Sequence, residues 1–187
     1  MSGVRLTRRG FALTAALAGC MPQERAAAPT ASDDPRPRVY ALLDRPAPAF
    51  AFPKRGGGEA RLADYAGKTL VLYFGGLWCP DCVADAPYVS RLSRLVATDP
   101  RLAFLQIHTR DRFGRWGSVD AFFAANNYAW PVAFDASQDF ARDIYKIEWS
   151  PSFLVIDKTG TIRRWRTDLG AAGAADFFAQ AQAVAAA

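Results

Sequence analysis

The sequence predicts an α/β fold with one central sheet, and three features of the 187-residue chain support this. Residues 69–74 form a continuous apolar run, typical of a strand that is buried on both faces. Apolar residues then recur at helical spacing from Asp81 onward, and a second apolar run follows at 102–108. Near the end of the chain, the runs 153–156 and 161–165 flank a turn and predict a β-hairpin. This order, without an internal repeat, is typical of an α/β domain.

The remaining elements rest on shorter local signals. Ser118 and Ser137 are typical N-cap residues, so each is expected to begin a helix. Three consecutive glycines at 56–58 mark a turn. In chain order, the signals predict a strand at 50–52, a helical turn at 62–65, a helix at 119–126, a strand at 131–134, a helix from 137 to 145 and a final helix at about 171–185.

The N-terminal segment predicts export from the cytoplasm. Arg8 and Arg9 form a twin-arginine start, and the apolar stretch that follows is too short to span a bilayer. The tetrapeptide ending at Cys20 resembles a bacterial lipobox, which implies cleavage before this cysteine and attachment of lipid to it. Two alternatives stay open: an amphipathic N-terminus that is not cleaved, and ordinary signal cleavage near 26–28 that frees a periplasmic protein.

These signals divide the chain into three parts. We expect a twin-arginine lipoprotein-type signal peptide at 1–19, a flexible tether at 20–38 and one globular domain at 39–187. Loss of the signal removes three arginines and lowers the formal net charge from +5 to +2. Such a charge gives no argument for nucleic acid, and the cluster Arg163, Arg164 and Arg166 is interpreted as the solvated side of a strand. A hydrophobic content of 51% excludes general disorder.

The most informative motif is Trp78-Cys79-Pro80-Asp81-Cys82, which lies where the first long strand gives way to a helix. Unpaired backbone N–H groups and the helix dipole stabilise a thiolate at such a helix start, and they lower a thiol pKa from about 8.5 to about 3.5–7.5. Cys79 is therefore the predicted nucleophile. Cys82 lies three residues later on the same helical face and is the predicted resolving thiol, which attacks the mixed disulfide.

A metal site is the alternative interpretation of the two cysteines. Structural zinc needs four ligands, and the other candidates in this chain are His108 and Cys20. We therefore expect no metal. His108 ends a predicted strand at the edge of the sheet where ligands gather in open α/β folds, but a structural role is favoured because nothing nearby forms a ligand set.

From about residue 46 to 168, the chain resembles the thioredoxin superfamily, in particular its membrane-tethered TlpA/ResA-type branch. The resemblance rests on the W-C-x-x-C motif, on Asp85-Ala86-Pro87 and on the segment 145–157. It implies a thioredoxin-like fold, in which a central mixed sheet has helices on both faces. It also implies that Pro151 forms a cis peptide bond and faces the dithiol, and that Ser150 offers backbone groups to an incoming peptide. An ordinary proline at a strand start is the alternative for Pro151.

Two carboxylates depart from the family pattern. Family members commonly carry proline directly before the second cysteine, whereas here Pro80 precedes Asp81. An ionised Asp81 near Cys79 disfavours the thiolate and shifts the site away from a strongly oxidising potential, although Asp81 turned to solvent would only assist the helix start. Asp85 stands where relatives often have glutamate; it is either the proton acceptor for Cys82 or an exposed acid of the first turns.

An aromatic residue next to the motif and a basic loop later in the chain are further candidates for the site. Trp78 is expected to cover the dithiol and to offer substrates an apolar surface, or else to serve in packing. A loop with Arg110, Arg112 and Arg115 also carries two aromatic residues, and it is a candidate for shaping the substrate cleft or touching lipid headgroups.

Together these features predict an enzyme of the cell envelope, a thiol–disulfide oxidoreductase that needs no cofactor. The expected partners are disulfide-containing exported proteins, a membrane thiol donor of electrons and the membrane itself through the lipid at Cys20; we expect a monomer. Family analogy alone adds a role in cytochrome c maturation. The alternatives are a copper-delivery module, which typically uses C-x-x-x-C with a histidine, and a peroxidase of the same fold, whose P-x-x-x-T-x-x-C loop this chain lacks.

Overall fold

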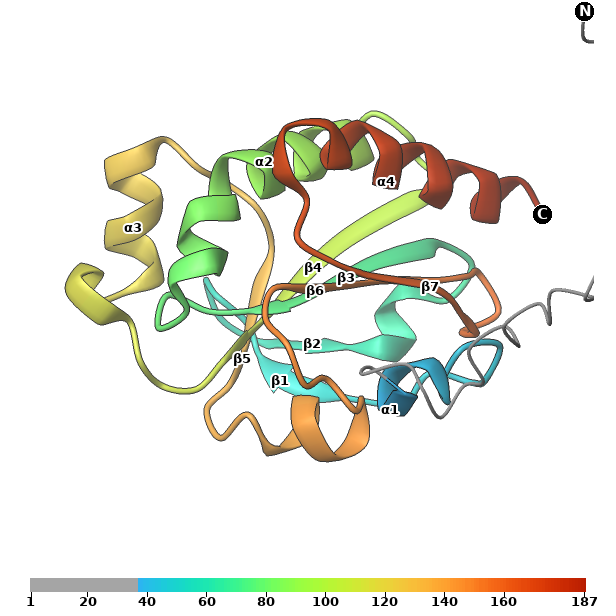
Figure 1. Ribbon diagram of the computed structural model, residues 1–187, viewed down its shortest axis with the longest axis horizontal. Coiled ribbons are helices and arrows are strands. Elements are labelled where there is room, and N and C mark those ends of the chain that lie inside the picture. The colour runs from blue at the N-terminus through green and yellow to red at the C-terminus, as the bar shows by residue number, and fades with distance from the viewer. Residues whose placement is uncertain (1–36) are drawn as a thin grey trace, which may run out of the picture.

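The structure, a computed structural model, describes residues 37–187, and the predicted signal, Cys20 and most of the predicted tether lie outside these residues. Its centre is a mixed sheet of five strands in the order β5-β4-β3-β6-β7 (Figure 1). The strands are β3 (Thr69–Gly75), β4 (Leu102–Thr109), β5 (Val132–Asp135), β6 (Ser152–Ile156) and β7 (Ile162–Thr167). β3, β4 and β5 are parallel, and β6 and β7 are antiparallel to their neighbours. The end of β3 therefore lies between the end of β4 and the start of β6.

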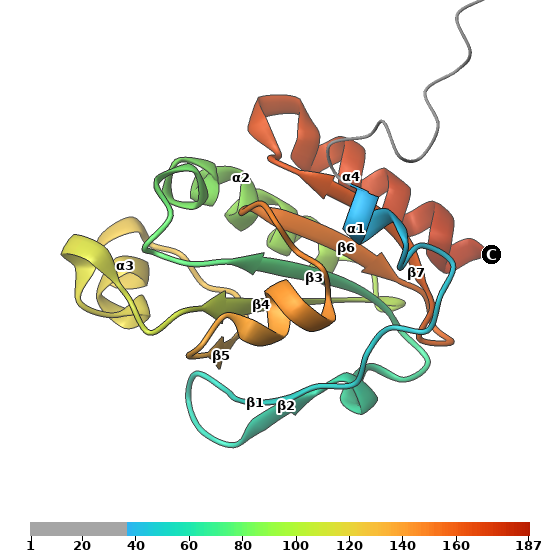
Figure 2. The same cartoon turned by 60° about the horizontal axis from the view of Figure 1, so that its bottom comes forward.

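Helices cover both faces of the sheet, as the resemblance to thioredoxins implied. One face carries α2 (Pro80–Ala97), α3 (Val119–Asn126) and α4 (Gly170–Ala186), and its core includes Leu92, Phe122 and Phe177. The opposite face carries α1 (Pro37–Tyr40), the hairpin β1–β2 (Ala51–Pro53 and Glu59–Arg61) and a π-helical turn at Phe140–Ile144 (Figures 1 and 2). Buried apolar side chains on both faces fix the sheet between these layers.

Local sequence signals account for most of these elements. Ser118 caps α3 by accepting a hydrogen bond from the Ala121 amide, as predicted. Pro80 occupies the first turn of α2, where its missing N–H costs nothing and its fixed φ favours the helix. The two short 3-10 helices at Leu62–Tyr65 and Gly114–Trp116 complete the connections, and the first of them was predicted as a helical turn.

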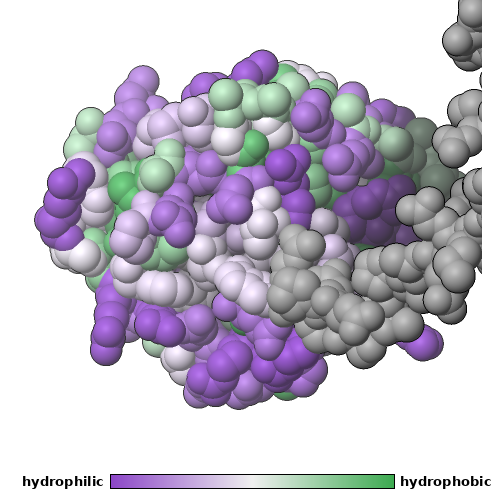
Figure 3. Space-filling view, viewed as in Figure 1, coloured by the Kyte–Doolittle hydropathy of each residue, from purple (hydrophilic) through white to green (hydrophobic). Residues whose placement is uncertain are grey.

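Three features differ from the expectations. The helix predicted from Ser137 to Tyr145 is only the single π-helical turn at Phe140–Ile144, although the Ser137 hydroxyl does accept a hydrogen bond from the Asp139 amide. Ion pairs of Arg142 with two neighbouring aspartates hold this turn, and Figure 3 shows hydrophilic side chains gathered over it. Strand β2, which pairs with β1 across the glycine turn, and helix α1 were not predicted, because elements of three and four residues are too short to show a periodic pattern.

The arginine cluster of β7 does not lie on one solvated side of the strand. Arg163 forms ion pairs with Asp44 and Asp157, whereas Arg164 is exposed. Arg166 places its guanidinium 5.9 Å from the Phe177 ring of α4. None of the helices between residues 37 and 187 combines the length and the apolar character that crossing a bilayer requires.

Candidate active site

Cys79 lies at the start of α2, at the sheet edge where β3 ends. It is the N-cap residue of the helix, and its Sγ accepts a hydrogen bond of 3.2 Å from the Cys82 amide. The side chain is only 5% exposed, and both sulfur atoms are present as free thiols. The sulfur thus takes the place of the oxygen that usually satisfies the first free amides of a helix.

The surroundings of Cys79 favour its thiolate. Its pKa is lowered from 9.0 to about 7, mainly because the Cys82 side chain hydrogen-bonds to it. Burial opposes this shift, and so does the negative charge of Asp81, while backbone N–H groups of Cys82 and Asp81 support it. A substantial fraction of Cys79 is therefore ionised at neutral pH, which a nucleophilic thiol requires.

Cys82 lies one turn further along α2 and is buried like Cys79. Burial is the largest cause that raises its pKa well above 9.0, and the nearby Cys79 sulfur raises it further. The Tyr73 hydroxyl, on a side chain that lines the same small cavity as Cys82, acts in the opposite direction and lowers this pKa. The two thiols therefore differ in protonation at neutral pH: Cys79 is partly ionised, and Cys82 is a thiol.

Ser150 and Pro151 lie directly against the dithiol. The peptide bond between them is cis, and the Cys79 thiol donates a hydrogen bond of 3.4 Å to the Ser150 carbonyl. An open hollow of about 250 Å³ adjoins this contact. Its lining residues are Asp81, Trp149, Ser150, Pro151, Thr167 and Asp168. Trp149 is 40% exposed there, so the hollow offers a partner an aromatic surface next to the nucleophile.

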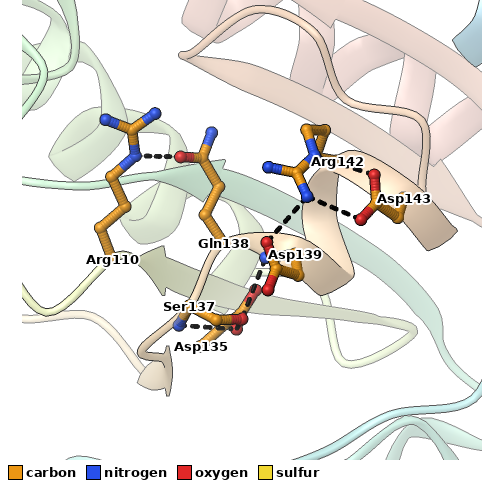
Figure 4. A network of polar contacts seen from close by, with 7 residues as sticks. All are labelled: Arg110, Asp135, Ser137, Gln138, Asp139, Arg142 and Asp143. Atoms are coloured by element: carbon orange, nitrogen blue, oxygen red, sulfur yellow. Dashed lines mark hydrogen bonds and ion pairs between the residues drawn. The ribbon is translucent and has the colours of Figure 1, made fainter.

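Trp78, the residue before Cys79, is held against the end of β4. Its indole N–H donates to the Thr109 carbonyl at the end of β4, and the Arg110 guanidinium lies 4.2 Å from its ring. Arg110 in turn donates to Gln138, so the loop after β4 is tied to the segment around the π-helical turn (Figure 4). Trp78 is half-buried and fixed on both sides, and it combines the packing role with a partly exposed apolar surface.

Asp85 is buried, and its two carboxylate oxygens bind the start of α4. They accept hydrogen bonds of 2.7 Å from the Leu169 amide and 3.1 Å from the Gly170 amide. Among the described residues, α4 has no N-cap side chain of its own, so Asp85 supplies the missing acceptor from α2. The structure rejects the exposed position as an alternative; the role in proton transfer stays a prediction.

His108 has a structural role: it holds the loop that precedes the Cys79 motif. Its Nε2 accepts a hydrogen bond of 3.0 Å from the Leu77 amide, and burial lowers the pKa of its imidazole to about 4. The ring is therefore neutral at pH 7 and holds the loop that leads to Cys79. Within residues 37–187, no three side chains of the metal-binding types come together.

Two residues of the site were missed at the level of sequence. Tyr73 was interpreted as one apolar residue of a strand, although its hydroxyl group reaches Cys82. Leu77 contributes a backbone amide that no sequence pattern reveals. The available signal was the hydroxyl itself: a tyrosine in an apolar strand six residues before a C-x-x-C motif needs a polar partner when it is buried.

Comparisons with known proteins agree with this geometry. Residues 43–168 match the family described as Redoxin. Thiol-disulfide oxidoreductase ResA of Geobacillus kaustophilus is 29% identical over 118 residues, which cover 63% of this chain and 65% of that protein. The match thus spans just under two thirds of that relative's length. The soluble secreted antigen MPT53 of Mycobacterium tuberculosis is 34% identical over 100 residues, or 53% of each chain.

Solved structures share the fold. A secreted disulfide oxidoreductase of Mycobacterium tuberculosis, described as homologous to E. coli DsbE, superposes with a TM-score of 0.57 and 27% identity, covering 72% of this chain and 95% of the other. A thiol:disulfide interchange protein of the thioredoxin family from Chlorobium tepidum gives a TM-score of 0.59 at 22% identity and covers 75% and 95%.

Proposed function

Because the chain belongs to the redoxin family and, within the thioredoxin superfamily, to the TlpA/ResA type, we propose that it is a thiol–disulfide oxidoreductase acting through Cys79 and Cys82. The observation that carries the proposal is the difference between the two thiols. Both are buried, but Cys79 has a pKa near 7 and contacts the Ser150 carbonyl, whereas the pKa of Cys82 is raised and this thiol is protonated. Disulfide exchange needs one thiolate that attacks the client and a second thiol that reacts only after the mixed disulfide has formed.

The reaction proceeds in two displacements. The Cys79 thiolate attacks one sulfur of a client disulfide; a mixed disulfide forms, and the other client sulfur leaves as a thiolate that takes up a proton. Cys82 then attacks the Cys79 sulfur and forms the internal disulfide, and the second client sulfur leaves. The proton lost by Cys82 goes to this departing sulfur. The client is reduced by two electrons, and the Cys79–Cys82 pair is oxidised by two.

Reduction of clients is the favoured direction. Asp81 raises the pKa of Cys79 and so acts against the other causes that lower it, and a less stabilised thiolate makes the dithiol a weaker oxidant. A reduction potential near that of thioredoxin, about −270 mV, would support this direction. A potential near about −120 mV would reverse it.

We propose that the protein acts in the cell envelope, on the periplasmic side, and is anchored there to a membrane. Relatives include ResA proteins, a secreted mycobacterial antigen and a thiol:disulfide interchange protein DsbE, which support an extracytoplasmic location. The twin-arginine start and the lipobox-like sequence support export and lipid attachment at Cys20, with residues 20–38 as the tether. Proteomic identification of a lipid-modified N-terminal Cys20 would test this part separately.

The clients we propose are exported proteins with disulfides, cytochrome c precursors among them, and the electron source is a thiol protein of the membrane. No cofactor takes part, and the protein acts as a monomer. The hollow beside Ser150 and Pro151 fits a polypeptide client, because it is open and presents Trp149.

Reduction of insulin disulfides tests the proposal. The Cys79→Ser variant should lose the activity, while Cys20→Ser should retain it, because Cys20 lies outside the redox motif. Retention of activity by Cys79→Ser would overturn the proposal. So would stoichiometric binding of Cu(I) by a protein that fails to reduce disulfides, since this is the behaviour of a copper-delivery module.

A further inference from the structure

The phenol of Tyr73 is part of the dithiol site. Tyr73 lies in β3, and its side chain is 2% exposed. Its ring stacks on Phe153 of the neighbouring strand β6, with a centroid distance of 4.6 Å and an interplanar angle of 11°. Its side chain and that of Cys82 line the same small cavity beneath Gly76, and the interaction between the hydroxyl group and the thiol lowers the pKa of Cys82. The strand therefore presents a polar group to Cys82, the thiol whose pKa is raised by burial.

Gly75 provides the space that this arrangement needs. A Cβ atom at Gly75 would lie 2.5 Å from the Tyr73 hydroxyl oxygen and 2.7 Å from two of its ring carbons. Real Cβ atoms do not approach other atoms so closely, and the φ angle of Gly75 is not in the left-handed region. The glycine is thus required for the room it leaves, because the Tyr73 phenol extends along the strand and lies over Gly75.

The Tyr73 hydroxyl group is protonated at neutral pH in the reduced protein. Burial is the largest cause that raises the pKa of Tyr73 well above 10, and the interactions with Cys82, Cys79 and Asp85 raise it further. Tyr73 therefore acts as a hydrogen-bond donor and not as a base. Asp85 is also engaged elsewhere, because both of its oxygens accept amide hydrogens at the start of α4.

We propose that Tyr73 is a catalytic residue of the second displacement, in which its O–H group donates a hydrogen bond to the Cys82 sulfur as this sulfur becomes a thiolate. This inference rests on the proposed disulfide exchange. A buried thiolate without a donor is costly, and a hydrogen bond to a charged acceptor is among the stronger ones in proteins. As Cys82 attacks the Cys79 sulfur, its proton goes to the departing client sulfur, while the phenol proton stays on Tyr73.

A coloured aryl disulfide separates the two displacements in one stopped-flow experiment. Attack by Cys79 releases one coloured thiolate, and attack by Cys82 releases the second. The Tyr73→Phe variant, in the full chain with Cys20→Ser, should keep the first rate within about threefold and slow the second about tenfold or more. The pH at which the second rate is half-maximal should rise. The matched control is Tyr145→Phe, which removes another buried hydroxyl, bonded to the Pro48 carbonyl, and should change neither rate.

Gly75→Ala provides an independent variant that keeps the hydroxyl but displaces it. If it folds, as judged by its thermal unfolding, it should slow the second release in the same way. The inference is overturned if Tyr73→Phe leaves the second rate and its pH profile unchanged, or if it slows both releases equally. Absence of any coloured release from the protein with native Tyr73 would contradict the proposed function instead.

Discussion

The outer and inner sides of the first turn of α2 place two chemically identical thiols in opposite environments. On the outer side, Cys79 caps the helix, accepts the Cys82 amide and contacts the Ser150 carbonyl. On the inner side, Cys82 is enclosed by the core and by the Tyr73 phenol. The pKa of Cys79 falls to about 7, whereas that of Cys82 rises. The difference shows that helix geometry and burial, rather than the sequence spacing alone, assign the two roles.

The largest expected effect comes from removing the inner thiol. In Cys82→Ser, the first displacement continues but no internal thiol resolves the mixed disulfide, so turnover should fall about a thousandfold or more, because an intramolecular attack is lost. Mass spectrometry of the reaction mixture should show the client covalently bound at Cys79. Cys20→Ser is the control and should turn over like the native chain. Rapid turnover by Cys82→Ser would contradict the assignment of the resolving role to Cys82.

Asp85 is expected to affect stability more than redox chemistry. Asp85→Ala leaves the Leu169 and Gly170 amides without acceptors and should lower the free energy of unfolding by about 2 to 4 kcal/mol. Asp81→Ala, on the exposed side of the same helix, should cost less than about 1 kcal/mol. Urea unfolding measures both. If Asp85→Ala unfolds like the native chain but resolves the mixed disulfide slowly, the result would show instead that Asp85 accepts the proton of Cys82.

His108 makes the stability of the fold depend on pH. Burial lowers its pKa to about 4 in the folded protein, against about 6.5 in an unfolded chain. Between these values the unfolded chain binds a proton that the folded protein does not, so stability falls as the pH falls through this range. The loss from about pH 7.5 to about pH 5 should be about 2 kcal/mol. Urea unfolding of His108→Gln should show a smaller loss; an equal loss would assign the dependence to other groups.

The smallest expected effect concerns the charge beside the outer thiol. Asp81 raises the pKa of Cys79, so Asp81→Asn should lower this pKa by less than about one unit. The rate of alkylation by iodoacetamide against pH gives the value. Asp168→Asn is the matched control, because Asp168 lines the same hollow and is not among the groups that shift Cys79. A rise of the pKa in Asp81→Asn would contradict the electrostatic account of the outer side.

Local patterns were enough to predict the elements that position the motif. The apolar run of β3, the helical spacing of α2 and the hairpin β6–β7 each depend on neighbouring residues, and the structure confirms them. The cis bond at Pro151 followed only from the family resemblance. The short π-helical turn at Phe140–Ile144 was predicted as a longer helix, because a capping serine and apolar residues do not specify how far a helix extends.

Contacts between distant residues explain the rest of what was missed. Asp85 binds an amide 84 residues away, and His108 binds an amide 31 residues away, so no window of sequence contains either pair. Tyr73 and Cys82 are closer in sequence, but the position of the Tyr73 phenol over Gly75 depends on how the strand packs, and no sequence pattern reveals it. Sequence therefore identified the two sulfur atoms, and the tertiary structure identified the groups that make them unequal.

The pH dependence of alkylation at the two sulfur atoms tests the central claim most directly. In the reduced protein with Cys20→Ser, mass spectrometry after short exposure to iodoacetamide reports each cysteine separately. Cys79 should react with a midpoint near pH 7, while Cys82 stays unmodified until well above pH 9. Equal midpoints, or faster alkylation of Cys82, would contradict the assignment of the nucleophile to the outer side of the helix.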